Sequence, residues 1–403
     1  MRCLLLAFGF LVFTSNIRAQ QIMSGVQSGG RPLLVNGDMA VLEGGEFRKD
    51  LECIVTPARP VLGFDLKFHT GFDVSVPMKE LEGNGDMLNI LFRVTPKDMG
   101  DPVYFSQQIR VPAIHESKGT ATLNGLFDLG EGIYQVDWLM HDYTGRYCSS
   151  FWETDAVLLP KDKQVALMLP ARAIRRAENE EFQPEPPVQR SPEAPLNVKV
   201  LMNFAPQRRD SASVDTLDTM ALVSILRNIS RNPRIGKFTL VAFNIQEQRV
   251  LYRQDSSDHI DFPSMGKALK TLSLGTVDLH RLERKNGDTE FLSGLIRNET
   301  NDQTNPDGLI FIGPKALIDS SVPQDDLKQV GDLEYPVFYM NYALDPAATP
   351  WKDAISRTVK FFKGREYTIS GPRDLWNAVA EVVSRMAKSK QSHVPGSAPT
   401  GQP

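Results

Sequence analysis

A short segment of the sequence combines the side-chain types of a nucleophilic triad. Residues 256–261, Ser-Ser-Asp-His-Ile-Asp, hold hydroxyls, carboxylates and an imidazole. Triad members meet through the fold and orient one another around a substrate, which neighbours on one loop cannot do. We therefore expect a turn followed by a helix start here, and we assign no catalytic residue.

Other motifs with a known chemistry are missing from the sequence. It has no G-x-S-x-G, no G-x-x-x-x-G-K-[ST] and no H-E-x-x-H motif. The six histidines follow no metal-ligand spacing, and they are His69, His115, His141, His259, His280 and His393. The sequence therefore predicts no cofactor and no metal. An enzyme of unrecognised type on a doubly wound fold stays an alternative, since active-site residues far apart in sequence give no motif.

The apolar run 196–204, LNVKVLMNF, follows a proline-rich break and is typical of the first, central strand of an α/β domain. Its polar tip begins at Asn203 and ends at Gln207, and Arg208 and Arg209 follow. In an open α/β sheet, the crevice outside the carboxyl ends of the strands is the natural binding face. The two arginines would supply cationic contacts to an acidic partner. The alternative is that they are solvated loop charges.

Residues 20–170 have the pattern of an antiparallel β-sandwich. Short alternating runs separated by turns indicate about seven strands, at 46–56, 63–77, 87–96, 103–112, 121–129, 132–142 and 146–159. No helix is expected among them. On the sixth run Tyr134, Val136, Trp138 and Met140 share one face, which we expect to point inward. This G-x-Y-x-V-x-W pattern is similar to the late strands of immunoglobulin-like domains.

Beyond residue 170 the composition changes twice. Residues 171–195 are acidic and dense in proline, which predicts a semi-stiff linker, with a helical turn at its start. Residues 196–387 alternate strands with helices, which predicts an α/β doubly wound, mostly parallel sheet covered on both faces. Residues 388–403 are polar and are expected to form a disordered tail.

The order of elements in 196–387 is similar to the von Willebrand factor type A domain. The matching segments are the first strand, the turn Asn286-Gly287-Asp288-Thr289 and the strand 308–313. In that family a D-x-S-x-S strand end, a Thr and a later Asp hold a divalent cation, which a partner's carboxylate completes.

The metal-binding positions of this family are altered here. The aspartates correspond to Asn203 and Gly313, and the serines correspond to Ala205 and Gln207. Because Mg²⁺ requires hard oxygen ligands that include carboxylates, the resemblance implies a von Willebrand A-like domain without a working metal site. It predicts a partner-binding face, composed of Asn203, Gln207, Arg208, Arg209, Asp288 and Thr289.

The N-terminus predicts export. A short basic start, an apolar core and a small residue before a cut at Ala19/Gln20 indicate a signal peptide over 1–19, the alternative being an N-terminal anchor. No other segment approaches the roughly 20 apolar residues of a spanning helix. Of the three cysteines, Cys53 and Cys148 remain after processing, and we expect them to form a disulfide rather than stay free thiols.

These features predict a secreted or periplasmic, non-catalytic protein-interaction protein, either an adhesin or a scaffold, whose partner is another protein. The formal net charge of −4 and the lack of a basic block argue against nucleic acid. Besides the enzyme alternative, a purely structural component of the cell envelope is also consistent with the sequence.

Overall fold

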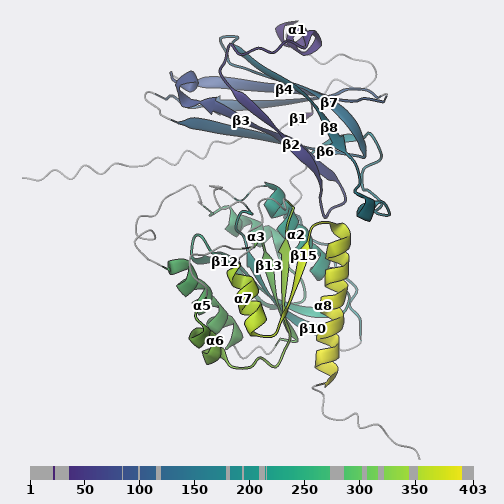
Figure 1. Cartoon of the computed structure of the whole chain (residues 1–403), viewed down its shortest axis with the longest axis vertical. Coiled ribbons are helices and arrows are strands. Elements are labelled where there is room, and N and C mark those ends of the chain that lie inside the picture. Colours follow the sequence, from purple (N-terminus) through teal and green to yellow (C-terminus); the bar gives the residue numbers. More distant parts are fainter. Residues whose placement is uncertain are drawn as a thin grey trace, which may run out of the picture. The chain divides into compact units, whose positions relative to one another are not determined.

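The structure is a computed structural model that describes residues 21–22, 36–83, 85–98, 100–114, 119–177, 182–192, 195–207, 214, 216–272, 286–301, 306–315, 322–344 and 353–392. They form two compact units (Figure 1). The β unit takes residues up to 61 with 68–158 and 167–177, and the α/β unit takes 62–67, 159–166 and the residues after 177. At this level the predicted two-part fold is confirmed. No helix in these ranges is long and apolar enough to cross a membrane.

The β unit contains two antiparallel sheets. The five-stranded sheet has the order β1 (Gln21–Ile22), β5 (Val103–Val111), β4 (Asp86–Pro96), β7 (Gly132–His141) and β8 (Tyr147–Ala156). The four-stranded sheet has the order β2 (Ile54–Leu62), β3 (Phe68–Pro77), β6 (Thr120–Leu129) and β9 (Ile174–Arg176). A 3₁₀ turn, η1 (Met78–Leu81), follows β3.

Aromatic side chains join the two sheets. The ring of Phe72 on β3 lies 5.3 Å from Phe92 on β4 and 5.5 Å from Trp138 on β7, centroid to centroid. Phe105 on β5 lies 5.9 Å from Phe127 on β6. The sheets therefore pack face to face as a sandwich. The face of β7 predicted to point inward is buried throughout, which confirms that prediction; it comprises Tyr134, Val136, Trp138 and Met140.

Tyr134 ties the start of β7 to the turn before it. Its hydroxyl donates to the carbonyl of Gly130 at 2.8 Å and lies 3.3 Å from that of Ala173. This is the geometry of a tyrosine corner in immunoglobulin-like sandwiches. Burial raises the pKa of the Tyr134 hydroxyl to about 12, which nearby Arg172 partly opposes.

Helix α1 (Asn36–Gly44) lies before the first of the seven predicted strands, where the sequence predicts no element, and it covers part of the outer face of the five-stranded sheet. Its Val41 and Leu42 pack against Leu139, which explains why this outward residue of β7 is buried. Two buried apolar side chains on a helix of nine residues are too few to give a helical period in the sequence.

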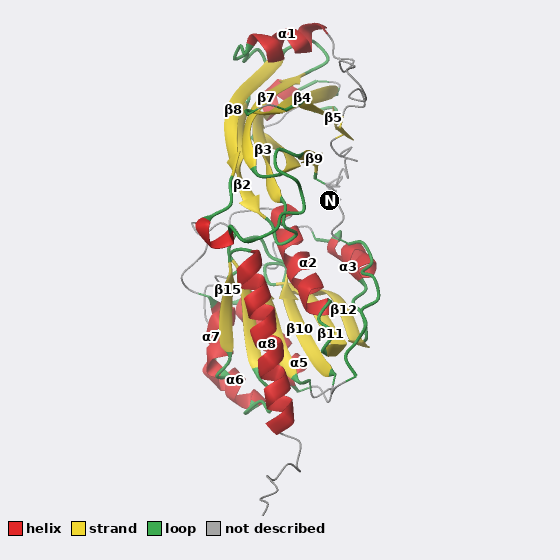
Figure 2. Cartoon of the chain, turned by 90° about the vertical axis from the view of Figure 1, so that its right-hand side faces the viewer, coloured by secondary structure: helices red, strands yellow, loops and turns green. Residues whose placement is uncertain are grey.

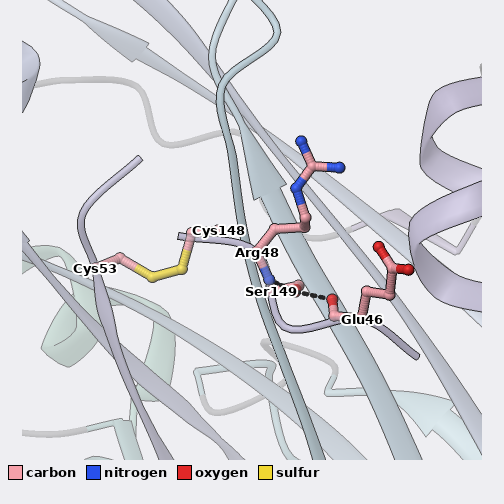
Figure 3. Close-up of a disulfide and its surroundings, with 5 residues drawn as sticks. All are labelled: Glu46, Arg48, Cys53, Cys148 and Ser149. Carbon is pink, nitrogen blue, oxygen red and sulfur yellow. Dashed lines mark hydrogen bonds between the residues drawn. A yellow bond between two sulfur atoms is a disulfide. The ribbon is translucent and has the colours of Figure 1, made fainter. Parts of the chain in front are cut away.

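A strap rather than a strand occupies most of 46–56, since β2 begins only at Ile54. The strap follows β8 (Figure 3): the N–H of Arg48 donates to Ser149 Oγ at 2.7 Å, and Ser149 Oγ donates to the carbonyl of Glu46 at 2.7 Å. Cys53 and Cys148 form a disulfide at its end, with their Cα atoms 6.2 Å apart.

Two parts of the predicted linker 171–195 are structured. Residues 174–176 form β9, which pairs with β6, so the helical turn expected there is wrong. Residues 182–192 are not a free spacer, because Arg190 donates to three carbonyls at 2.9–3.0 Å, those of Ser230, Asn232 and Asp258. Glu185 also pairs with Arg227 and Arg231. Low periodicity signals an irregular backbone, but it does not exclude such side-chain anchors.

The α/β unit contains one six-stranded sheet. Its order is β12 (Arg249–Ser257), β11 (Ile235–Asn244), β10 (Leu196–Asn203), β13 (Gly308–Gly313), β14 (Val337–Tyr342) and β15 (Arg365–Ile369). Only the β11–β12 pair is antiparallel among these neighbours. β11 and β12 therefore form a hairpin at one edge of the sheet.

Helices cover both faces of this sheet. One core lies under α2 (Thr216–Ser230), α3 (Phe262–Leu269) and α8 (Pro372–Ser392) (Figure 2). The other lies under α5 (Gly287–Thr300), α6 (Gln324–Val330) and α7 (Ala354–Phe361) (Figure 1). Because α8 continues to Ser392, the start of the predicted tail at residue 388 is wrong, and residues 393–403 lie outside the described ranges. The turn η2 (Pro160–Asp162) also belongs to this unit.

Candidate functional site

The strand order of the α/β sheet reverses between β10 and β13. Counted from β10, the spatial order is 3-2-1-4-5-6, so the chain winds outward in both directions from this pair. Ligands of open α/β sheets bind outside the carboxyl ends of the strands at such a switch point. Three residues lie side by side across adjacent strands near the carboxyl ends of these strands: Asn203 on β10, Gly313 on β13 and Asn341 on β14.

Asn203 presents an unused donor. Its side chain is fully buried, and its Oδ1 accepts a hydrogen bond from the backbone N–H of Ile245 at 3.2 Å. A backbone N–H can only donate, so this contact fixes which end of the amide is oxygen. The Nδ2 group is buried and has no hydrogen-bond partner in the described part of the chain.

Asn341 presents an unused acceptor in the same way. It is fully buried, and its Nδ2 donates to Glu366 Oε1 at 2.9 Å. That contact requires the nitrogen to face Glu366. The Oδ1 atom is buried without a partner among the described residues. Because leaving a buried polar group unpaired costs about 1–3 kcal/mol, two such atoms in one row require an explanation.

Gly313 separates these two asparagines. A Cβ atom added there would lie 2.9 Å from the Cβ of Asn203 and 3.1 Å from its carbonyl oxygen. Any larger residue would push Asn203 aside, so the glycine allows β13 to approach Asn203 closely and places no side chain between the two amides. We call Asn203, Gly313 and Asn341 the amide row.

A charged cluster supports Asn341 from the side. Glu366 Oε1 lies 3.4 Å from Lys315 Nζ, and Glu366 Oε2 lies 2.8 Å from Ser356 Oγ. Ser356 Oγ also lies 2.9 Å from Asp353 Oδ2. Asp353 caps α7 by accepting from the N–H of Ile355 at 3.1 Å. The cluster comes from three separate segments, and Asn341 from a fourth, so no sequence motif could identify it.

Tyr339 lies two residues before Asn341 on β14 and therefore on the same face of the sheet as the amide row. Its hydroxyl donates to the carbonyl of Pro314 at 2.9 Å. Burial, followed by the carboxylate of Asp353, holds the pKa of the Tyr339 hydroxyl well above its ordinary value. Tyr339 therefore acts as a neutral donor that orders the chain after β13.

The other described residues of the predicted face each make contacts of their own. Gln207 is buried, and its backbone N–H donates to Asp218 Oδ2 at 3.1 Å. Asp288 accepts from Gln248 Nε2 at 2.9 Å. Thr289 is buried in the first turn of α5. Arg208 and Arg209 lie outside the described residues. Among the described contacts, none joins Asn203 to Asp288, so the predicted face as one surface stays a prediction.

The triad-like segment 256–261 is a strand end and a helix cap. β12 ends at Ser257, and Asp261 caps α3 by accepting from the N–H of Ser264 at 3.0 Å. Hydrogen bonds from the side chain and from the N–H of Ser264 lower the pKa of the Asp261 carboxyl. His259 is exposed, and its Nδ1 atom lies 2.7 Å from the Oδ1 atom of Asp258. The predicted turn and helix start are confirmed.

Within the described ranges, no group of three or more His, Cys, Asp or Glu side chains could hold a metal ion. The charged cluster combines a hydroxyl with two carboxylates, and no described imidazole contacts Ser356. Both carboxylates are hydrogen-bonded to this hydroxyl, and Glu366 also pairs with Lys315, so the four side chains form one network. The arrangement can recognise a polar group through hydrogen bonds.

No family model and no curated protein matches the chain. Among solved structures, it matches a mutant of the PilB minor pilin from Streptococcus sanguinis at 10% identity and a TM-score of 0.28, over 79% of this chain and 91% of the pilin chain. It also matches beta-glucuronidase 2 from Bacteroides uniformis at 9% identity and a TM-score of 0.19, over 84% of this chain and 32% of that chain. TM-scores this low do not establish a shared fold.

Proposed function

We propose that this chain is a secreted or periplasmic, non-catalytic interaction protein. In this proposal its α/β unit is a von Willebrand A-like domain without a working metal site, and the carboxyl edge of the sheet contacts a protein partner. The observation that carries the proposal is the switch point between β10 and β13, at which Asn203 and Gly313 occupy the positions that the resemblance assigns to the family's two aspartates.

The two ends of α5 give a direct test of which edge of the sheet binds the partner. Asn286, just before the helix, and Asn301, just after it, are both exposed and lie at opposite ends of the same helix. Gln248, from the turn after β11, contacts Asp288, so the Asn286 end lies at the carboxyl edge of the sheet. A photo-cross-linking amino acid at Asn286 should therefore capture a partner in the producing cells, whereas one at Asn301 should not. Equal capture at both positions, or capture only at Asn301, would refute the binding edge.

The lack of a metal site is tested separately by calorimetric titration of the full chain with Mg²⁺, Mn²⁺ and Ca²⁺. We expect no saturable heat, because neutral amides do not replace the carboxylates that these cations need. One-to-one binding at micromolar strength would contradict the proposal. For export, we expect the mature chain to begin at Gln20, and a retained Met1 in protein recovered from the producing cells would count against it.

A further inference from the structure

We propose that the amide row recognises a neutral carboxamide group, such as the side chain of an asparagine or glutamine on the partner. This inference deepens the proposed function, on which it rests for the identity of the binding edge. It is based on two fully buried amides that each leave one polar atom unpaired within the described residues, Nδ2 of Asn203 and Oδ1 of Asn341.

The two unpaired atoms have opposite requirements. Asn203 needs a hydrogen-bond acceptor, because its oxygen is already engaged by Ile245. Asn341 needs a donor, because its nitrogen is already engaged by Glu366. A primary carboxamide carries one acceptor and two donors side by side, and it can satisfy both.

The spacing of the row favours a group larger than one atom. Asn203 and Asn341 lie on strands that flank β13, so their backbones are roughly 10 Å apart, two strand spacings. Gly313 contributes no side chain between them. A planar group with its acceptor toward one asparagine and its donor toward the other matches this arrangement.

Charged ligands fit the row less well. A carboxylate has acceptors only, so it would pair with Asn203 but face the oxygen of Asn341, with the Glu366 carboxylate 2.9 Å beyond the Asn341 nitrogen. A guanidinium or amidinium has donors only, so it would pair with Asn341 but face the NH₂ group of Asn203. Sites that hydrogen-bond a ligand reject analogues that leave a buried group unpaired.

Three isosteric molecules test this directly: acetamide, acetate and acetamidinium. Each is titrated into the full chain, and the side-chain NH₂ signals of Asn203 and Asn341 are followed by NMR. Acetamide should cause saturable shifts in the millimolar range, where an affinity of 1 mM corresponds to about −4 kcal/mol. Acetate and acetamidinium should bind at least tenfold more weakly. N-Methylacetamide, which mimics a peptide bond, separates a backbone source from a side-chain source.

The substitution Asn203→Asp provides a reversal of preference. Its Oδ1 keeps the contact with Ile245, while its second oxygen replaces the donor with an acceptor. The row then presents acceptors only, so acetamidinium should bind better than acetamide. Asn301→Asp, exposed after α5, is the matched control and should leave the wild-type preference unchanged. If Asn203→Asp does not fold, the titrations of the unmodified chain still decide.

Equal shifts from all three molecules, or no saturable shift from acetamide, would overturn the inference and leave an internal water as the partner of the two amides. Cross-linking from Asn286 reads the binding edge independently of these probes. Capture of a partner without an acetamide response would refute only the carboxamide preference, whereas failure of capture with a response would refute the partner-binding edge.

Discussion

The ammonium group of Lys199 lies 3.5 Å from Glu299 Oε2 and donates to the Glu299 carbonyl at 2.8 Å, and both side chains are 1% exposed. The pair joins the middle of β10 to the end of α5. Arg253 on the edge strand β12 also pairs with the Glu299 carboxylate. A buried charge without a partner is expensive, so this pair fixes how α5 lies along the sheet.

Removal of one partner should cost more on one side of this pair than on the other. Glu299→Gln removes the buried carboxylate that pairs with both Lys199 and Arg253, and it should lower the free energy of unfolding by about 3–5 kcal/mol. Lys199→Met should cost less, because Arg253 still pairs with Glu299. Urea unfolding of both variants and of the double variant measures this. A larger loss for Lys199→Met would show that Arg253 does not compensate the Glu299 charge in the absence of Lys199.

Tyr134→Phe should remove the tyrosine corner and its pH dependence. The lost hydrogen bond to Gly130 should cost about 0.5–1.5 kcal/mol at neutral pH. Because burial raises the folded-state pKa from 10.0 to about 12, the contribution of the hydroxyl is complete below pH 10 and is lost as the pH rises from 10 to 12. Unfolding measured from pH 9 to 11.5 should therefore show a steeper decline for the unmodified chain. Parallel curves would contradict this.

Reduction of the disulfide should destabilise the β unit selectively. Cys53 and Cys148 are 95 residues apart in sequence, and closing such a loop typically stabilises by about 2–5 kcal/mol. A reductant should lower the urea midpoint of the unfolding transition reported by the buried Trp138. The Cys53→Ser/Cys148→Ser variant is the control, and its midpoint should already be low and should not respond to reductant. An unchanged midpoint in the unmodified chain would mean that the bond adds no stability.

Arg190→Ala should release residues 182–192 from the α/β unit. The substitution removes the donor to three carbonyls, those of Ser230 at the end of α2, Asn232 just after it and Asp258 just after β12. Limited proteolysis should then cut within 182–192 at least tenfold faster than in the unmodified chain. Arg297→Ala, exposed on α5, is the matched control and should be cut at the original rate. Equal rates for both variants would restore the interpretation of this segment as the semi-stiff linker predicted from its composition.

The sequence predicted those elements in which the buried residues recur at a regular spacing along the chain. Alternation around Trp138 indicated which side of β7 faces the core, and the apolar run before Asn203 indicated the central strand of the sheet. Helix α1 gave no such signal, because the apolar residues that it buries against the sheet, Val41 and Leu42, are adjacent and do not recur at a helical spacing.

The site was only partly predictable for a different reason. Asn203 and Gly313 were identifiable from their places at strand ends, but Asn341 and Glu366 matter through contacts that only the strand order creates. The anchoring role of Arg190 was hidden in the same way, since its acceptors are backbone carbonyls that carry no sequence information. Composition describes a segment, whereas these roles depend on what the fold places beside it.

Each unit is assembled from three separate stretches of the chain, and the stretch 159–166 belongs to the α/β unit although it precedes β9 of the β unit. There Lys161 Nζ lies 2.8 Å from Ser370 Oγ and 3.4 Å from Asp374 Oδ2, at the start of α8. A single recombination point in the gene could therefore not exchange one unit intact. The two units are expected to be inherited together, and swaps between related genes that break near residue 180 should lose this anchor of α8.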